Sequence, residues 1–227
     1  MIALDRPGYG GTDPLPAGEM TFANGAEVLD ATIDRIWADR GGDRPGVVVL
    51  SHSIGSAIAV HLAARRPAWP LLGISLHGVG TRSPEHIVAA WHGIPADSGP
   101  IELPAGQRRA LLYGPEGTID TDVVEAAQAS VEPVPLAEML EIVDEWPDSV
   151  AELAAEVVVP VQYTLAQHGL WIVDDVRVAA FAGYFTAAPW VDAQIQPGAG
   201  HNLDHHRISR ALHLRQLAFA AECVARS

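Results

Sequence analysis

Short apolar runs alternate along this chain with longer amphipathic segments, and the alternation predicts strands that are each followed by a helix. The run Val47-Val48-Val49-Leu50 is uncharged and rich in β-branched residues, as is typical of a strand buried on both faces of a parallel sheet. The predicted strands cover residues 1–4, 47–50, 71–76, 157–165 and 191–195, and the predicted helices cover residues 23–38, 57–64, 173–185 and 206–225. This order predicts an α/β fold with a doubly wound, mostly parallel sheet.

Residues 81–156 interrupt this alternation. The segment contains no strong strand pattern, and its helical candidates are short, at residues 85–92, 122–131 and 136–145. Prolines recur through it, at positions 84, 95, 100, 104, 115, 133, 135 and 147. Because proline breaks regular elements, we expect a separate set of short helices here. The chain is therefore predicted to divide into a core, residues 1–80 and 157–227, and an inserted helical cap, residues 81–156.

The composition excludes several classes of protein. The 227 residues include 14 Lys and Arg against 28 Asp and Glu, a formal charge of −14, which argues against binding to nucleic acid or to an anionic membrane surface. No uncharged apolar run approaches the roughly 18–20 residues of a membrane span, and Asp5 and Arg6 interrupt the apolar start that a signal peptide would need. The single cysteine, Cys223, cannot form an internal disulfide. We expect a cytoplasmic globular protein.

A nucleophile is expected at the turn that follows the strand over residues 47–50. The turn has the sequence Ser51-His52-Ser53-Ile54-Gly55 and leads directly into a helix of small residues. A serine on a sharp strand-to-helix turn is held in a strained backbone position, with its Oγ exposed above the sheet. The free N–H groups of the helix then point at the oxyanion that forms when Oγ attacks a carbonyl. Ser53 is the candidate nucleophile, and an ordinary strand–helix turn is the alternative interpretation.

His201 is the candidate base. It lies in the glycine-rich segment Gly198-Ala199-Gly200-His201-Asn202 after the last predicted strand, from which an imidazole can reach the edge of the sheet where Ser53 emerges. His201 and His205 could instead form a metal-binding pair, but such pairs usually lie on one helix and the glycines place His201 in a loop. His52 is expected to pack near the turn, because adjacent residues on a sharp turn diverge. We expect no metal and no organic cofactor.

Three motifs of the sequence resemble those of the α/β-hydrolase family. They are the turn around Ser53, the segment around His201, and Leu4-Asp5-Arg6-Pro7-Gly8-Tyr9-Gly10-Gly11-Thr12-Asp13. Along the chain they follow one another in the family's order, with the cap between the turn around Ser53 and the segment around His201. The resemblance implies an α/β-hydrolase fold in which Ser53 is the nucleophile, His201 the general acid–base and the Ile54 amide one oxyanion donor. It implies a structural role for Asp5.

The chain departs from the family pattern at two places. In such folds the strand that matches residues 1–5 follows three strands, a helix and a loop that donates a second N–H to the oxyanion, so we expect a start upstream of Met1 or a truncated relative. The acid of the triad should follow the strand over residues 157–165, where Gly169 stands in the matching position. Asp174 is the tentative acid, although its place at the start of a predicted helix favours an N-cap. Disabling the acid has lowered the rate of a related triad about 10⁴-fold.

These residues predict a serine hydrolase that acts on an ester, a thioester or a related small-molecule acyl substrate. Ser53 would attack the carbonyl, His201 would transfer the proton, and water would release the acyl group. The alternative is a catalytically impaired α/β-hydrolase-like binding protein, which the missing carboxylate and the missing oxyanion loop favour.

Overall fold

A four-stranded parallel sheet forms the centre of the structure, a computed structural model that describes residues 1–16, 18–95 and 97–227. In spatial order, its strands are β1 (Val47–His52), β2 (Leu71–His77), β5 (Val161–Ala166) and β6 (Val191–Gln196). All three pairings between neighbouring strands are parallel. Each strand overlaps one of the apolar runs that predicted it, so the α/β fold with a parallel sheet is confirmed.

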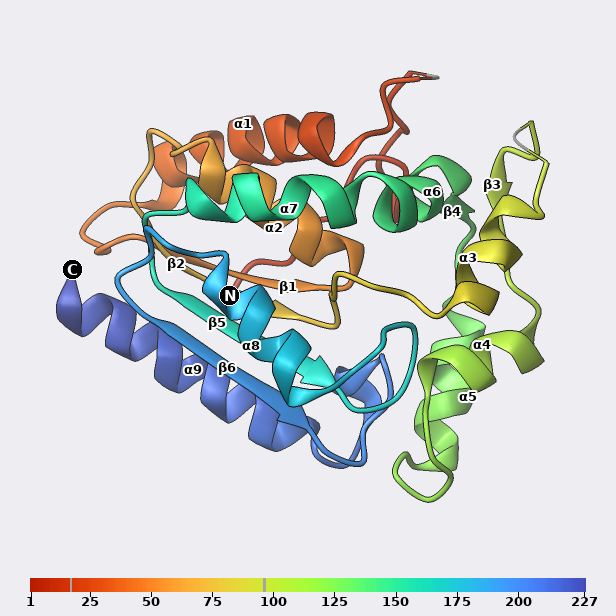
Figure 1. Cartoon of the computed structure of the whole chain (residues 1–227). Helices are drawn as coiled ribbons and strands as arrows, with labels where there is room; N and C mark the ends of the chain where they lie inside the picture. The colour runs from red at the N-terminus through yellow and green to blue at the C-terminus, as the bar shows by residue number, and fades with distance from the viewer. Residues whose placement is uncertain (17, 96) are drawn as a thin grey trace.

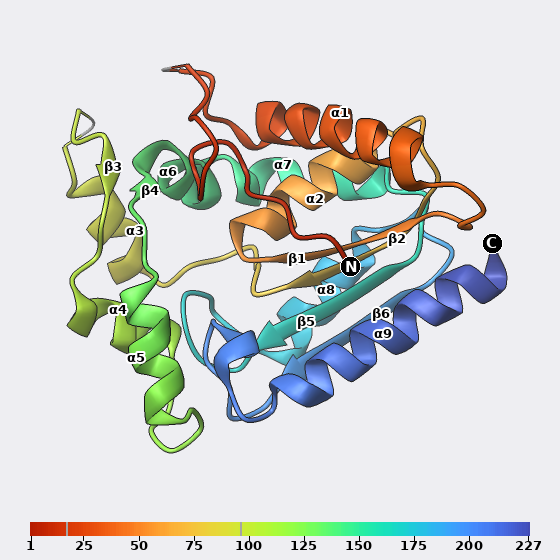
Figure 2. The ribbon, with the colours of Figure 1, turned by 180° about the vertical axis from the view of Figure 1, so that it is seen from behind.

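Helices cover both faces of this sheet (Figure 1, Figure 2). The helices that flank it are α1 (Phe22–Arg40), α2 (Ile54–Ala64), α7 (Trp146–Ala155), α8 (Asp175–Gly183) and α9 (Ser209–Arg226). On one face the Phe181 ring of α8 packs against Tyr163 of β5, with ring centroids 4.4 Å apart. On the other face α9 approaches so closely that a Cβ on Gly73 of β2 would come within 2.7 Å of the Cys223 sulfur. No helix in the described part of the chain is long and apolar enough to cross a membrane.

The helix α2 is buried on most of its surface. It contacts both β1 and β2 of the sheet, and α1 and α7 pack against it as well. Its sequence is apolar all round, as expected for a helix without a solvent face, and its buried residues are Ile54, Ser56, Ala57, Ile58, Ala59, Val60, Leu62 and Ala63. A side chain at the start of α2 therefore stands on a rigid, well-packed element.

The segment over residues 81–156 contains the three predicted helices and two that the pattern missed, α4 and α7. Its elements before α7 are α3 (Glu85–His92), β3 (Pro100–Ile101), α4 (Ala105–Leu112), α5 (Thr121–Ala129), β4 (Val134–Pro135) and α6 (Leu136–Asp144), with β3 and β4 paired antiparallel. Pro84, Pro104 and Pro135 immediately precede α3, α4 and α6, and Pro147 lies in the first turn of α7. Proline is tolerated there because the first N–H groups of a helix have no partner within it. Four of the eight prolines of this segment therefore lie where its helices begin.

The division between core and cap stays a prediction. The helix α7 belongs to the segment assigned to the cap, but its Trp146 and Val150 side chains are buried in the same apolar cluster as Ile74 and Leu76 of β2. The helices α6 and α7 also both contact α2. The last part of this segment is therefore packed as one body with the sheet.

The apolar start of the chain does not form the predicted strand. Residues 1–6 have no regular secondary structure, and the Met1 and Ile2 side chains are exposed. Within the described residues, β1 is an edge strand that pairs only with β2, and residues 1–6 form no ladder of hydrogen bonds with its other edge. The turn that follows is anchored to α6 instead, because the Arg6 guanidinium and the Tyr9 hydroxyl donate to the Glu138 carboxylate at 2.5 and 2.6 Å. The prediction of a strand over residues 1–4 is therefore wrong.

A half-buried carboxyl group on α6, that of Glu141, makes the stability of the fold depend on pH. The Glu141 oxygens accept the Phe22 N–H at the start of α1, at 2.9 and 3.0 Å. Burial raises the pKa of Glu141 to about 7 against the lowering effect of that hydrogen bond, and the charges of Glu145 and Glu138 add to the rise. Below the ordinary carboxyl pKa the group is protonated in both the folded and the unfolded chain. As pH rises towards 7 the unfolded chain loses this proton first, so the folded state loses stability.

We therefore expect Glu141 to lower the free energy of unfolding by about 1–3 kcal/mol between pH 5 and pH 8. Urea unfolding of wild type and Glu141→Gln at both pH values measures this, because the variant cannot ionise. Glu141→Gln should gain stability relative to wild type at pH 8 and not at pH 5. Glu152→Gln, an exposed carboxyl on α7, is the matched control and should show no such gain. A gain that does not change with pH would contradict the assignment.

Candidate active site

Ser53 lies on the tight turn between β1 and α2. Its backbone has φ +54° and ψ −128°, a positive-φ conformation that residues with side chains rarely adopt. This is the strained geometry expected of a nucleophile on a strand-to-helix turn. The buried Ser56 Oγ lies 3.0 Å from the carbonyl oxygens of both Ser51 and His77, which ties the turn to the end of β2.

His201 meets Ser53 from the loop that follows β6. The imidazole Nε2 lies 2.8 Å from the Ser53 Oγ, a distance at which the hydroxyl donates a hydrogen bond to the ring. His201 is only 3% exposed, and burial, together with the neighbouring imidazoles of His52 and His77, holds its pKa well below the ordinary value. The ring is therefore neutral at pH 7 and can accept the hydroxyl proton. The structure thus brings together the two residues that the sequence proposed as nucleophile and base.

Close main-chain contacts hold the His201 loop in place. A Cβ on Gly200 would come within 2.5 Å of the Gly114 nitrogen, so only glycine allows the loop to approach the end of α4 so closely. The Asn202 N–H donates to the Leu112 carbonyl at 2.9 Å in the same region. His201 is therefore positioned partly by backbone from the segment between β2 and β5.

The loop that follows β2 borders the site and is held by three buried aromatic side chains. A Cβ on Gly78 would lie 3.5 Å from the His201 Cε1, which places this loop beside the ring. Each of three successive carbonyls accepts one side-chain hydrogen bond of 2.8 Å: Trp171 Nε1 to Gly78, Tyr163 Oη to Val79 and Trp146 Nε1 to Gly80. These bonds satisfy the buried backbone oxygens and hold the loop in one conformation.

Ile54, the predicted oxyanion donor, is the first residue of α2. The first N–H groups of a helix have no acceptor within it and carry the positive end of the helix dipole. An oxyanion formed on a carbon bonded to Ser53 Oγ would therefore lie near a free donor. The role of Ile54 stays a prediction.

The tentative acid Asp174 does not join the pair. Its side chain caps α8, accepting the Arg177 N–H at 2.7 Å, and forms an ion pair with the Arg177 guanidinium. The hydrogen bond from the Arg177 N–H, with the charge of that guanidinium, lowers the pKa of Asp174. In the part of the chain that the structure describes, no carboxylate is hydrogen-bonded to His201. The N-cap that the sequence favoured for Asp174 is therefore what the structure shows.

Gly169, at the expected position of the acid, lies directly against His201. A Cβ there would be 3.0 Å from the His201 Cβ, and the residue has φ +133°, a conformation that favours glycine. A carboxylate introduced at this position would therefore strain the backbone and press on the loop of the base. Because this position requires the backbone freedom of glycine, Gly169→Asp is not expected to restore a triad, and we expect that variant to be less stable than wild type.

Asp174→Asn is expected to change kcat/KM for an ester substrate by less than tenfold, which is about 1.4 kcal/mol of barrier. An asparagine oxygen can still accept the Arg177 N–H, so the helix cap is largely kept. Steady-state kinetics with p-nitrophenyl acetate, alongside a thermal melt, measure both effects. Loss of turnover in a folded Asp174→Asn protein would identify Asp174 as the acid after all.

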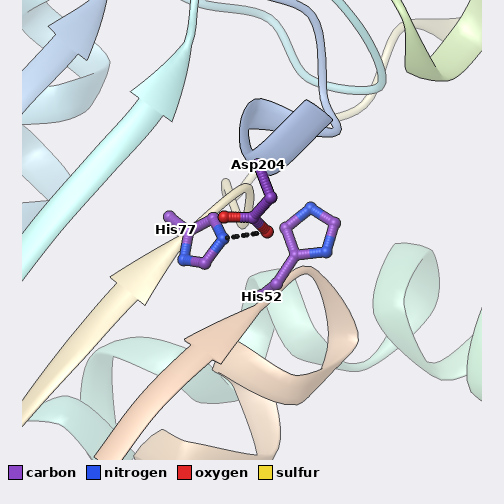
Figure 3. A group of neighbouring side chains, drawn as sticks. All are labelled: His52, His77 and Asp204. Carbon is purple, nitrogen blue, oxygen red and sulfur yellow. Dashed lines mark hydrogen bonds and ion pairs between the residues drawn. The ribbon is translucent and has the colours of Figure 1, made fainter. Parts of the chain in front are cut away.

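Three polar side chains that the sequence did not bring together form a cluster (Figure 3). One of them, His52, has its ring centroid 4.9 Å from that of His201. His77, at the end of β2, lies with its Nε2 3.1 Å from an Asp204 carboxylate oxygen. The His52 ring stacks on the His77 ring at a centroid distance of 4.8 Å, and its Nε2 donates to the His201 carbonyl at 3.1 Å. His52 thus packs near the turn, as expected. The only signal in the sequence was that His52 and His77 both follow predicted strands closely, at the end of the sheet where α/β folds place their sites.

Burial and neighbouring charges shift the pKa values in this cluster. Burial, and then the imidazole of His77, lowers the pKa of His52 to about 4. Burial raises the pKa of Asp204, but the hydrogen bond from His77 and the surrounding imidazoles outweigh it and lower the pKa to about 2. At pH 7 His52 is therefore neutral and Asp204 is ionised.

The metal-binding pair of His201 and His205, considered from the sequence, does not form. The His201 Nε2 is directed at Ser53, whereas the His205 ring stacks on Tyr113 at a centroid distance of 5.8 Å. The two imidazoles leave the chain in different directions because His201 lies before the short 3-10 helix η1 (Leu203–His205) and His205 at its end.

Comparisons with known proteins agree with the α/β fold described above. The model of the alpha/beta hydrolase family matches residues 1–214. A comparison with curated proteins finds no match. Among solved structures, the chain is similar to a thermophilic esterase from Thermogutta terrifontis, with 20% identity, a TM-score of 0.67 and coverage of 96% of this chain and 78% of that one.

Two further solved structures are similar to this chain in fold. A thermostable carboxyl esterase from Bacillus coagulans has 19% identity and a TM-score of 0.63, over 91% of this chain and 74% of that one. A monoacylglycerol lipase from Paleococcus ferrophilus has 15% identity and a TM-score of 0.61, over 94% and 79%. Identities this low establish the fold, while the chemistry has to be argued from the site itself.

Proposed function

The chain belongs to the alpha/beta hydrolase family, and from this we propose that it is a serine hydrolase that cleaves an ester, a thioester or a related acyl compound. The observation that carries the proposal is the pair formed by Ser53, on a strained turn, and the neutral, buried His201, with 2.8 Å between Oγ and Nε2. The esterase and lipase folds of the similar structures support it.

The proposed reaction uses the pair in two steps. The Ser53 Oγ attacks the acyl carbonyl while its proton passes to the His201 Nε2, and the Ile54 N–H donates to the oxyanion. The imidazolium then gives this proton to the leaving group, which departs and leaves an acyl-serine. Water loses a proton to the same Nε2, attacks the acyl carbon and releases the acid, and Ser53 Oγ recovers its proton.

Among the residues that the structure describes, no carboxylate orients the His201 ring. Its main chain is held by the hydrogen bond from His52 to its carbonyl and by the contacts of Gly169 and Gly200. These contacts fix the position of the ring but supply no negative charge to stabilise the imidazolium. We therefore propose slow turnover compared with a complete triad, whose acid contributes about 10⁴ in rate.

A binding protein with impaired catalysis is the second candidate. The observation that favours it is that no carboxylate within the described residues is hydrogen-bonded to His201. Such a protein would keep the acyl-binding site and bind the same class of small molecule without releasing product.

The cytoplasmic location and the lack of nucleic-acid and membrane partners, expected from the sequence, remain predictions.

Labelling with a fluorophosphonate tests the proposed function directly. The reagent forms a covalent bond with an activated serine, and mass spectrometry of the digested protein should place it on Ser53. Ser51 provides an internal control, because its Oγ is engaged with the Ser75 carbonyl at 3.1 Å and should stay unlabelled. Absence of label on the folded protein, under conditions that label an active esterase, would favour the binding protein.

A further inference from the structure

Three metal-ligating side chains from separate parts of the chain converge beside the proposed active site (Figure 3). His52 ends β1, His77 ends β2, and Asp204 lies in η1. Each offers one nitrogen or oxygen atom, and these three atoms all lie within 4.8 Å of one another. The cluster shares no side chain with the pair of Ser53 and His201.

We propose that His52, His77 and Asp204 bind a divalent transition-metal ion, with Zn²⁺ as the best fit. Two imidazoles and one carboxylate form the three-ligand set of open zinc sites, in which water or another small ligand takes the fourth position. Imidazole nitrogens favour zinc and its neighbours over Mg²⁺ or Ca²⁺, which prefer oxygen ligands. The carboxylate of Asp204 also supplies a negative charge to a cation in a largely buried place.

The spacing of two of the ligands already suits such an ion. The His77 Nε2 and the Asp204 Oδ2 are 3.1 Å apart, whereas two ligands of a tetrahedral zinc ion at about 2.0–2.1 Å from it are about 3.3 Å apart. The third ligand atom, on His52, lies within 4.8 Å of the other two, so the His52 side chain has to move closer to complete the set. The Asp204 side chain is 35% exposed, which gives an ion a path from solvent, while His77 is 6% exposed.

The Nδ1 atom of His77 makes no hydrogen bond to the described residues of the folded chain, although it is buried. When Nε2 binds a metal, a neutral imidazole carries its proton on Nδ1. The change of tautomer breaks no hydrogen bond at Nδ1, but it leaves a buried N–H without an acceptor among the described residues, a cost that the metal bonds must offset. The ion would replace a hydrogen bond to Asp204 with a stronger contact to the same carboxylate.

Occupation of this site would act on His201. The His52 Nε2 now donates to the His201 carbonyl, and the two rings are 4.9 Å apart. A bound ion takes that nitrogen as a ligand, which releases the His201 carbonyl, and it places positive charge near an imidazole that must become cationic during turnover. Zn²⁺ is therefore expected to inhibit ester hydrolysis, an effect that rests on the proposed function, whereas binding does not.

Titration of the full chain with ZnCl₂ after removal of metals by EDTA tests the site. Isothermal titration calorimetry should show one strong site per chain, and Co²⁺ at the same site should give the visible absorption of a tetrahedral ion with nitrogen ligands. Asp204→Asn and His77→Gln should each weaken binding at least tenfold. Circular dichroism of both variants shows whether the fold persists, and either one alone suffices if the other unfolds.

His92→Gln is the matched control. His92 Nε2 lies 3.0 Å from an Asp144 oxygen on the surface, a histidine–aspartate pair without a third ligand within the described residues. This variant should bind Zn²⁺ as wild type does. Zinc binding that survives both Asp204→Asn and His77→Gln, or that is lost in His92→Gln, would overturn the proposal and leave the cluster a hydrogen-bonded network alone.

The inhibition experiment separates this proposal from the proposed function. In an active protein, Zn²⁺ at saturation should lower the turnover of p-nitrophenyl acetate at least fivefold, and EDTA should restore it. If the chain binds Zn²⁺ through Asp204 and His77 but hydrolyses no ester, the metal site stands and the hydrolase is wrong. If it hydrolyses esters but binds no Zn²⁺, the hydrolase stands and the metal site is wrong.

Discussion

Ser53→Ala is expected to lower kcat/KM for a short p-nitrophenyl ester about 100-fold. Removal of the serine of a complete triad costs about 10⁶ in rate, while removal of its acid alone costs about 10⁴. A Ser53–His201 pair that already works without a carboxylate therefore has about 10² left to lose. The remaining rate comes from substrate binding and the oxyanion donors, which the substitution does not touch.

Ser51→Ala is the matched control for this measurement. It removes a hydroxyl two residues away whose Oγ bonds the Ser75 carbonyl and the Ser56 hydroxyl. We expect a small loss of stability, about 1 kcal/mol, and less than tenfold change in kcat/KM. Activity that is undiminished in folded Ser53→Ala protein would assign hydrolysis to another residue or to a contaminant.

Trp146→Ala is expected to lower the free energy of unfolding by about 3–5 kcal/mol, a large part of the 5–15 kcal/mol typical of a folded domain. Trp146 is 1% exposed, packs near Phe181 of α8, and donates its indole N–H to the Gly80 carbonyl at 2.8 Å. The substitution leaves a cavity between α7 and the sheet and an unpaired buried oxygen. At about 2–4 °C per kcal/mol, the melting temperature should fall by roughly 6–20 °C.

Trp146→Phe separates the two contributions. Phenylalanine fills most of the cavity but cannot donate to Gly80, so its loss should be about 1–3 kcal/mol. Chemical unfolding of the three proteins gives both values. An effect of Trp146→Ala below 1 kcal/mol would contradict the close packing of α7 against the sheet and would favour a separately folded cap.

Local patterns in the sequence were sufficient to predict the four strands of the sheet and to propose Ser53 and His201, which the structure brings together. The strands at 47–52 and 71–77 are recognisable because each begins with an uncharged, largely apolar run, which suits a sheet covered by helices on both faces. The strand β2 is buried from Gly73 to His77, whereas β1 is half-buried and its Leu50 is exposed. The strained turn at Ser53 needs small neighbours, and the His201 loop needs glycine at Gly200, where another backbone approaches. Each of these requirements comes from the local backbone geometry, so it is visible in a short stretch of consecutive residues.

Prolines and short apolar runs were harder to interpret. The same residue type can end a helix or begin one, and Pro147 begins α7 because its missing N–H would have no partner in the first turn. The run over residues 1–4 is apolar enough for a strand, but a strand forms only where a neighbour offers hydrogen bonds. The local sequence decides neither whether a proline ends or begins a helix nor whether an apolar run forms a strand. Both outcomes depend on the elements that pack against these residues in the folded chain.

The sequence by itself determined the α/β fold and proposed Ser53 and His201, since each follows from a local requirement of strand burial or turn geometry. Only the tertiary structure decided how His201 is held and what surrounds it. Asp174 could cap a helix or reach the base, and the position of Arg177 decided for the cap. His52, His77 and Asp204 lie up to 152 positions apart (204 − 52), and meet because parallel strands end at one edge of the sheet. Such a meeting depends on the register and order of the strands, which no local pattern of side chains encodes.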